Sequence, residues 1–173
     1  MQITRLETYN IIWNQLQNSK FKELQLALLL EKFQKREKTL NIFLVIATSS
    51  SISAWAIWQL DYLKWLWAGI IALSQIVILV KPYLNYVKYA KELNEKHFLL
   101  ETLNVEYEKL WLAFKFQKIS IQEAFDKSFE LKTTMSKSLN FSDDVLVTKS
   151  KKIADQAKAD LLNYLKVTFN YNP

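Results

Sequence analysis

Hydroxyl side chains gather inside an apolar stretch of this sequence, and they are its most chemically suggestive residues. The group consists of Thr48, Ser49, Ser50, Ser51 and Ser53. A second apolar stretch holds Ser74 and Gln75. Polar side chains on apolar helices either hydrogen-bond to a neighbouring helix or face water. Two interpretations therefore stay open for Thr48, Ser51, Ser74 and Gln75, namely helix packing and a pore-facing stripe in an oligomer.

The composition excludes several kinds of catalytic and metal site. A single glycine, Gly69, cannot build the glycine-rich loops that hold phosphates. The chain has no cysteine and one histidine, His97, which excludes cysteine nucleophiles, zinc fingers, iron–sulfur sites and multi-histidine metal centres. Neighbouring carboxylates such as Glu106 and Glu108 have no nucleophile and no metal-ligand spacing beside them. We therefore expect no enzymatic activity, no cofactor and no metal.

Two charge-free runs dominate the sequence, at residues 41–60 and 65–80. About 20 apolar residues in a helix span a hydrocarbon core roughly 30 Å thick. The first run has this length, and the second reaches it if Lys81 snorkels and the apolar stretch continues to residue 84. The pattern predicts a transmembrane helical hairpin over 41–84, with spans at 41–60 and 65–84. A soluble all-α protein with a buried hairpin is the alternative.

Basic residues flank the predicted hairpin and indicate its orientation. They are Lys32, Lys35, Arg36 and Lys38 before it, and Lys81, Lys88 and Lys91 after it. Because short basic flanks stay on the cytoplasmic side, both termini are expected in the cytoplasm and the hairpin in the cell membrane. The chain then divides into an N-terminal cytosolic and juxtamembrane part (1–40), the hairpin (41–84) and a C-terminal cytosolic helical region (85–173).

A heptad seam follows the second apolar run. Apolar side chains recur in alternating steps of three and four from Tyr86 to Phe114, and the pattern is broken once at Lys96. The residues that we expect to form the oligomer or bundle seam are Leu93, Leu100, Leu103, Tyr107, Leu110 and Phe114. Such a seam packs against another helix, which is either the N-terminal helix of the same chain or the same helix in another subunit.

Shorter signals predict the remaining helices. Apolar residues at helical spacing predict one helix over Ile3–Gln17, and Ser19 is a suitable N-cap for a second one. Ser120–Glu123 has the sequence of a capping box, and Ser142–Asp144 has the acidic residues of another helix start. The predicted fold class is an all-α membrane protein, in which a two-helix transmembrane hairpin carries a cytosolic helical bundle built from the N- and C-terminal segments.

The order of these parts resembles a known group of proteins. An amphipathic N-terminal region, two closely joined apolar helices and a long helix reading Tyr-Glu-Lys-Leu-Trp at residues 107–111 are similar to the SLATT families of bacterial two-transmembrane effectors. The resemblance implies an oligomeric pore-forming or membrane-disrupting effector of an anti-phage, abortive-infection system. It also implies the bacterial inner membrane as location, the lipid bilayer and further copies of the chain as partners, and a nucleotide second messenger or sensor protein as trigger. A membrane-anchored adaptor that docks a soluble partner is the alternative, and no nucleic acid partner is expected.

Overall fold

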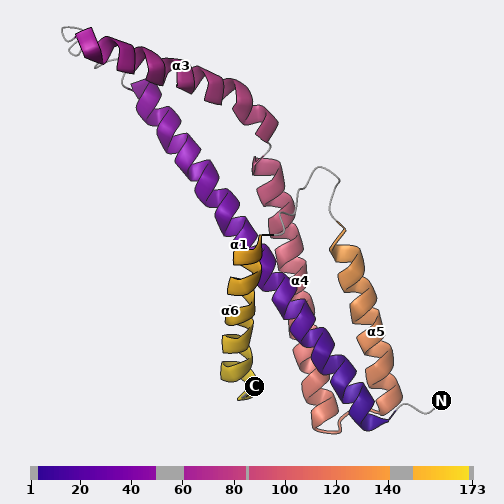
Figure 1. Ribbon diagram of the computed structural model, residues 1–173. Helices are drawn as coiled ribbons and strands as arrows, with labels where there is room; N and C mark the ends of the chain where they lie inside the picture. The colour runs from indigo at the N-terminus through magenta and orange to yellow at the C-terminus, as the bar shows by residue number, and fades with distance from the viewer. Residues whose placement is uncertain (1–3, 50–60, 85, 141–149, 172–173) are drawn as a thin grey trace. The chain divides into compact units, whose positions relative to one another are not determined.

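The computed structural model describes residues 4–49, 61–84, 86–140 and 150–171, and these are almost entirely α-helical (Figure 1). The helices are α1 (Arg5–Ser49), α3 (Asp61–Leu84), α4 (Tyr86–Lys115), α5 (Ile121–Ser138) and α6 (Lys151–Phe169). The predicted all-α class is confirmed in the described part of the chain. The helices belong to two compact units, which we call the first unit (Met1–Leu30 with Lys91–Pro173) and the second unit (Glu31–Ala90).

The helix α1 is longer than the sequence pattern predicts. It runs without a break through 45 residues, so the predicted helix start after Ser19 is wrong. Ser19 is buried on the inner stripe of the helix and therefore does not cap a helix end. The chain has no proline or glycine in this part of α1 to interrupt it, and a good N-cap residue alone does not break a helix whose buried stripe continues.

A long antiparallel pairing of α1 with α4 forms the centre of the first unit. The buried stripe of α1 consists of Thr8, Ile12, Leu16, Ser19, Glu23, Leu26 and Leu29. The guanidinium Nη2 of Arg5 donates to the carbonyl oxygen of Phe114 at 3.0 Å, whereas Glu23, further along α1, accepts from Asn104, which lies earlier in α4. The two helices therefore run in opposite directions.

The six seam residues of α4 all lie inside this unit. Leu93, Leu100, Leu103, Tyr107, Leu110 and Phe114 are buried. Ile12 and Leu16 of α1 belong to the same buried cluster as Tyr107 and Phe114 of α4. Of the two partners that the heptad spacing leaves open, the N-terminal helix of the same chain thus covers at least this part of the seam.

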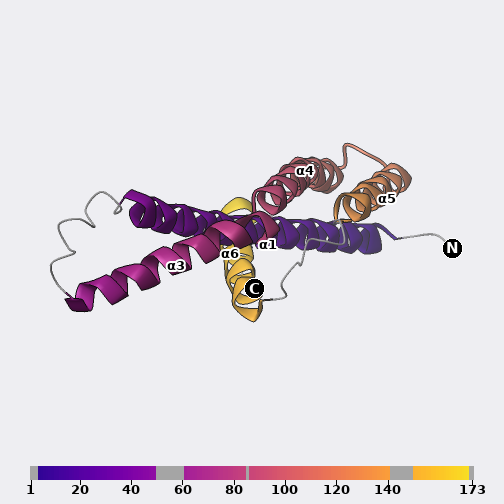
Figure 2. The same ribbon diagram turned by 90° about the horizontal axis from the view of Figure 1, so that it is seen from above.

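The helices α5 and α6 complete the first unit, and Figures 1 and 2 show α5 beside α4. The predicted capping box is confirmed at its N-cap, because the backbone N–H of Glu123 donates to Oγ of Ser120 at 3.2 Å. The helix α6 buries Ala157 and Leu165, and Leu165 joins the cluster between α1 and α4. The helix start predicted at residues 142–144 lies outside the described residues.

The described residues of the second unit are the end of α1, the whole of α3 and the first residues of α4. Among the α3 side chains that the structure describes, those with reduced exposure are Ile70, Ser74, Val77 and Lys81, at steps of four, three and four. Lys81 Nζ donates to Asn41 Oδ1 of α1 at 2.7 Å. The rings of Phe33 and Tyr89 lie 6.2 Å apart at the basic end of this unit. One stripe of α3 therefore packs within the unit, and the other described side chains of the helix are exposed.

The membrane prediction requires a correction. In the ranges that the structure describes, no helix combines the length and the apolar character needed to cross a membrane. This finding overturns the predicted transmembrane hairpin, the membrane-protein class and the inner-membrane location.

The physical reason lies in α3 and in the end of α1. The charge-free part of α3, residues 65–80, extends over about 24 Å at ~1.5 Å per residue, which is less than a core of roughly 30 Å. Lys81 does not extend this span by snorkelling, because its ammonium group is hydrogen-bonded to Asn41. Residues 50–60 of the first predicted span lie outside the described residues.

Candidate functional site

The helix α3 exposes large apolar side chains along most of its length. These residues, which we call the α3 surface, are Trp65, Leu66, Ile71, Leu73, Ile76, Ile78, Leu79 and Val80. Trp65 is 84% exposed and Leu79 is 69% exposed, fractions more typical of surface lysines than of tryptophan or leucine. Ile42, Val45 and Ile46 of α1, in the same unit, are exposed too. Exposed apolar surface of this kind marks an interaction site in a folded protein.

Small residues interrupt the α3 surface. Ala68, Gly69 and Ala72 are exposed, and a Cβ atom added to Gly69 would meet no other atom within 4 Å. Helices approach one another most closely where small residues lie between larger ones. The α3 surface therefore has both apolar area and a stretch of small side chains against which a second helix can pack closely.

The polar residues predicted as pore-lining or packing candidates lie in different surroundings. Ser74 is buried, and its hydroxyl donates to the carbonyl oxygen of Ile71 at 2.7 Å. Gln75, the next residue, is exposed. Thr48 belongs to α1 without a described side chain, and Ser51 lies outside the described residues. The structure thus brings no two of these four side chains together among the residues whose side chains it describes.

A buried carboxylate in the first unit forms a second candidate site. Glu23 accepts hydrogen bonds from Lys20 Nζ at 2.7 Å and from the Asn104 side-chain amide. Nε2 of His97 lies 3.8 Å from its other carboxylate oxygen. A buried charge is stable only with such partners, because an unpaired one costs several kcal/mol. The sequence carries one signal for this cluster, a glutamate on the buried heptad stripe of α1, and our sequence reasoning missed it.

The cluster continues to α6 through Tyr164. Its hydroxyl donates to the Glu108 carboxylate, and Lys20 Nζ lies 4.8 Å from the centre of its ring. Burial, followed by the hydrogen bond to Glu108 and the charges of Glu108 and Glu23, raises the pKa of the Tyr164 phenol. The phenol therefore stays protonated at physiological pH and acts as a hydrogen-bond donor that attaches α6 to α4. This arrangement stabilises the fold and holds no activated nucleophile.

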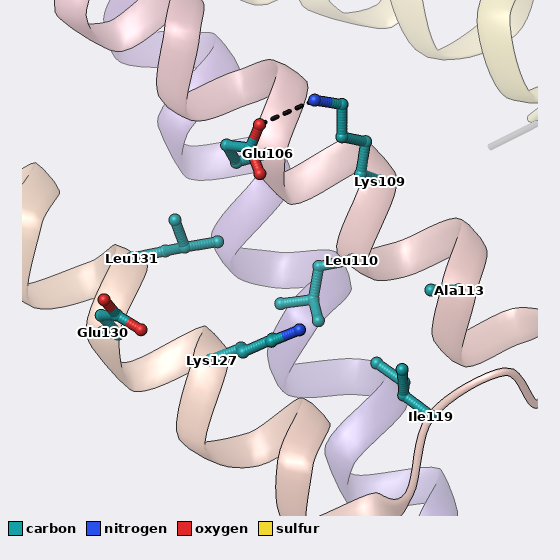
Figure 3. Close-up of a pocket in the computed structure, with 8 residues that line it drawn as sticks. All are labelled: Glu106, Lys109, Leu110, Ala113, Ile119, Lys127, Glu130 and Leu131. Atoms are coloured by element: carbon teal, nitrogen blue, oxygen red, sulfur yellow. Dashed lines mark hydrogen bonds and ion pairs between the residues drawn. The ribbon is translucent and has the colours of Figure 1, made fainter.

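A cavity of about 430 Å³ lies between α4 and α5 (Figure 3). Its lining residues are Glu106, Lys109, Leu110, Ala113, Ile119, Lys127, Glu130 and Leu131. Figure 3 shows Lys127 and Leu131 extending from α5 towards Leu110 on α4.

The charges of this cavity limit what it can bind. Lys109 pairs with Glu106 at 2.8 Å, and Lys127 pairs with Glu123 at 3.3 Å. Each lysine thus has a carboxylate of its own helix beside it, so the cavity has no surplus positive charge for a phosphate group. Within the described ranges, no group of three or more potential metal ligands comes together. The α3 surface is therefore the feature with the clearest functional meaning.

Comparisons with known proteins add no functional assignment. The sequence matches no family model, no curated protein and no solved structure. The similarity to the SLATT families stays a prediction based on the residues quoted above.

Proposed function

We propose that this protein acts by binding and assembly, not by catalysis, and that further copies of the chain bind to the α3 surface. One observation carries the proposal: the large apolar side chains of α3 are exposed along most of the helix. Burying a leucine or isoleucine side chain stabilises a complex by about 1.5–3 kcal/mol. Several such side chains on one helix supply enough apolar area for stable association, provided that the partner presents a matching surface.

A second copy of the chain presents such a surface. Residues 65–80 carry no charge, so two copies of α3 approach one another without placing like charges in contact. The small residues Ala68, Gly69 and Ala72 allow the larger side chains of the other copy to pack between Trp65 and Ile76. A symmetric pair uses the same patch on both subunits, which suits a surface complementary to itself.

The resemblance to the SLATT families extends the proposal to a biological setting. In that setting the protein is an effector of bacterial anti-phage defence, and a sensor protein or nucleotide second messenger triggers it. Assembly through the α3 surface would be the step that the trigger controls. The pore-forming or membrane-disrupting activity of such an effector stays a prediction.

The substitution Gly69→Leu tests the assembly surface. The space around Gly69 is open and leucine favours a helix over glycine by roughly 0.8–1 kcal/mol, so the variant keeps its fold. The leucine side chain nevertheless occupies the space beside Ala68 and Ala72 in which a second helix would pack. We expect the mass of the full-length protein, measured by light scattering after gel filtration, to fall below that of the wild-type oligomer.

Two further samples make this test decisive. Ala159→Leu, at an exposed position of α6, adds a similar side chain elsewhere and should leave the oligomer unchanged. Ile76→Glu places a charge in the α3 surface and should lower the mass of the oligomer as Gly69→Leu does. A monomeric wild type would refute the proposal, and flotation of that monomer with phosphatidylglycerol vesicles would identify lipid as the molecule that covers α3.

A further inference from the structure

A second row of apolar side chains follows the outside of α4 in the first unit. The row, which we call the outer stripe, consists of Phe98, Val105 and Leu112 in α4 and Phe116 in the turn directly after it. Their exposed fractions are 65%, 44%, 41% and 63%, although three of the four side chains are the size of leucine or larger. The intervals between them are seven, seven and four residues, and the backbone N–H of Phe116 still donates to the carbonyl oxygen of Leu112 at 3.0 Å, as in a helix. Side chains at these intervals lie on one face of an α-helix.

The neighbours of α4 in this unit occupy its other faces. Leu100, Leu103 and Tyr107 are buried on the face towards α1. Leu110 and Ala113 line the cavity shared with α5, and Glu108 contacts Tyr164 of α6. Among the described residues, none of these three helices covers the outer stripe.

The spacing of the outer stripe indicates the shape of its partner. A repeat of seven residues keeps an apolar row facing a second helix along its whole length, with the side chains of one helix inserted between those of the other. Thr102 and Lys109 fill the alternate positions of the same face. The outer stripe thus has the pattern of a coiled-coil seam, and it is distinct from the seam that α1 covers.

We propose that the outer stripe of one copy pairs with the outer stripe of a second copy, with the two α4 helices antiparallel. In this arrangement Phe98 of each copy lies opposite Phe116 of the other, and Leu112 lies opposite Thr102. The pairing uses first-unit residues alone, so it does not depend on assembly through the α3 surface.

The charges beside the stripe favour the antiparallel direction. Glu101 and Lys115 are exposed on the same flank of the stripe, and antiparallel pairing places Glu101 of one copy beside Lys115 of the other at both ends. Parallel pairing would instead place Glu101 beside Glu106, which brings two carboxylates together. At the centre, Lys109 is 2.8 Å from Glu106 and offsets its charge, whereas the Glu108 carboxylates of the two copies come near one another and each accepts a hydrogen bond from Tyr164.

Together the two surfaces determine the kind of assembly. A chain that pairs through α3 in one unit and through α4 in the other has two separate self-binding surfaces. Such chains form extended assemblies unless the symmetry closes them. If copies of the chain bind one another through the α3 surface alone, they form only a dimer or a small ring, not an extended assembly.

The substitution Leu112→Glu tests the outer stripe, and Leu162→Glu in α6 is the matched control. Leu162 is 43% exposed in the same unit, close to the 41% of Leu112, so both variants lose a similar amount of folded-state packing. Both substitutions are made in the Gly69→Leu chain, which removes the contribution of α3. Leu112→Glu should weaken the remaining dimer at least 100-fold by sedimentation analysis, and Leu162→Glu should leave it unchanged. A Gly69→Leu chain that is monomeric at 100 μM, or equal effects of the two substitutions, would overturn the proposal.

Disulfide trapping tests the direction of pairing, because the chain has no cysteine of its own. A Phe98→Cys chain is mixed with a Phe116→Cys chain and oxidised mildly. Antiparallel pairing should give the mixed disulfide between the two different chains as the main product. Parallel pairing should give disulfides between identical chains, and that result would overturn the antiparallel arrangement.

Discussion

The two units of this protein differ in how far they bury their apolar side chains. In the first unit, Ile12, Leu16, Tyr107 and Phe114 are almost fully buried by helices of the same chain. In the second unit, α3 is more apolar along its length, yet only one stripe of it is shielded. A helix buries its apolar face only where other helices surround it, and the described residues of the second unit form fewer helices than those of the first. The difference teaches that apolar content alone does not make a core.

Polar contacts follow the same division. Glu23 is buried in the first unit and has three polar neighbours, Lys20, Asn104 and His97. In the second unit, Lys81 of α3 donates a hydrogen bond to Asn41 of α1. A buried charge makes the fold sensitive to each of its partners, whereas a long lysine side chain at a helix edge can turn to water instead.

The largest expected effect contrasts the two units directly. Phe114→Ala should destabilise the protein by about 3–5 kcal/mol, because it removes a buried aromatic ring and leaves a cavity. Leu79→Ala, in the α3 surface, should change the free energy of unfolding by less than about 0.5 kcal/mol in a dilute, monomeric sample. Urea unfolding followed by circular dichroism measures both. Similar losses in the two variants would contradict the contrast between a buried and an exposed apolar region.

A smaller effect is expected at the polar contacts. Glu23→Ala should cost about 2–3 kcal/mol, since it leaves the Lys20 ammonium and the Asn104 amide without their charged acceptor. Asn41→Ala should cost less than about 1 kcal/mol, because Lys81 can reach solvent. The two variants are compared by the same urea titration at low protein concentration. If Asn41→Ala lowered the free energy of unfolding more than Glu23→Ala, the second unit would depend on its polar contact more strongly than the first unit depends on the contacts of Glu23.

The helix cap of α5 should contribute about 1 kcal/mol to the first unit. Ser120→Ala removes the hydroxyl that accepts from the Glu123 N–H at 3.2 Å. Ser136→Ala, at an exposed position near the other end of the same helix, is the control and should be neutral or slightly stabilising. Thermal unfolding of both variants gives the comparison. The cap would have no role in stability if the two melting temperatures changed alike.

The smallest effect at neutral pH is expected for Tyr107→Phe. Among the described residues, the buried Tyr107 hydroxyl has no hydrogen-bond partner, so its removal should change stability little at pH 7. Burial raises the pKa of this phenol to about 12, against about 10 in the unfolded chain.

The direction of the pH dependence follows from these values. Below pH 10 both states keep the proton, and between pH 10 and about 12 the unfolded chain releases it while the folded protein retains it. Stability should therefore fall as the pH rises through this range. Urea titrations at pH 7, 10 and about 11.5 should show a smaller fall in Tyr107→Phe than in the wild type. If the free energy of unfolding fell equally in the wild type and in Tyr107→Phe, other groups would cause the loss of stability at alkaline pH.

The sequence by itself determined the local features of this protein. The capping box at Ser120, the heptad period of α4 and the all-α class depend on residues a few positions apart, where backbone and side-chain geometry are nearly fixed. The exclusion of phosphate-binding loops follows in the same way, because Gly69 is the only glycine. The exposed outer stripe on α4 was also present in the sequence, but its intervals become visible only when the face that α1 covers is known.

The tertiary structure decided which surfaces are covered. Glu23 and Asn104 are 81 residues apart in sequence, and their contact exists only because α1 and α4 pair in opposite directions. The same pairing buries Ser19 within a continuous helix, although its residue type favours a helix start. The hydrogen bond from Lys81 to Asn41 joins residues 40 positions apart, where the sequence alone predicts a lysine that extends a membrane span. Burial depends on which distant segments pack together, and a local pattern of residues does not specify which segments those are.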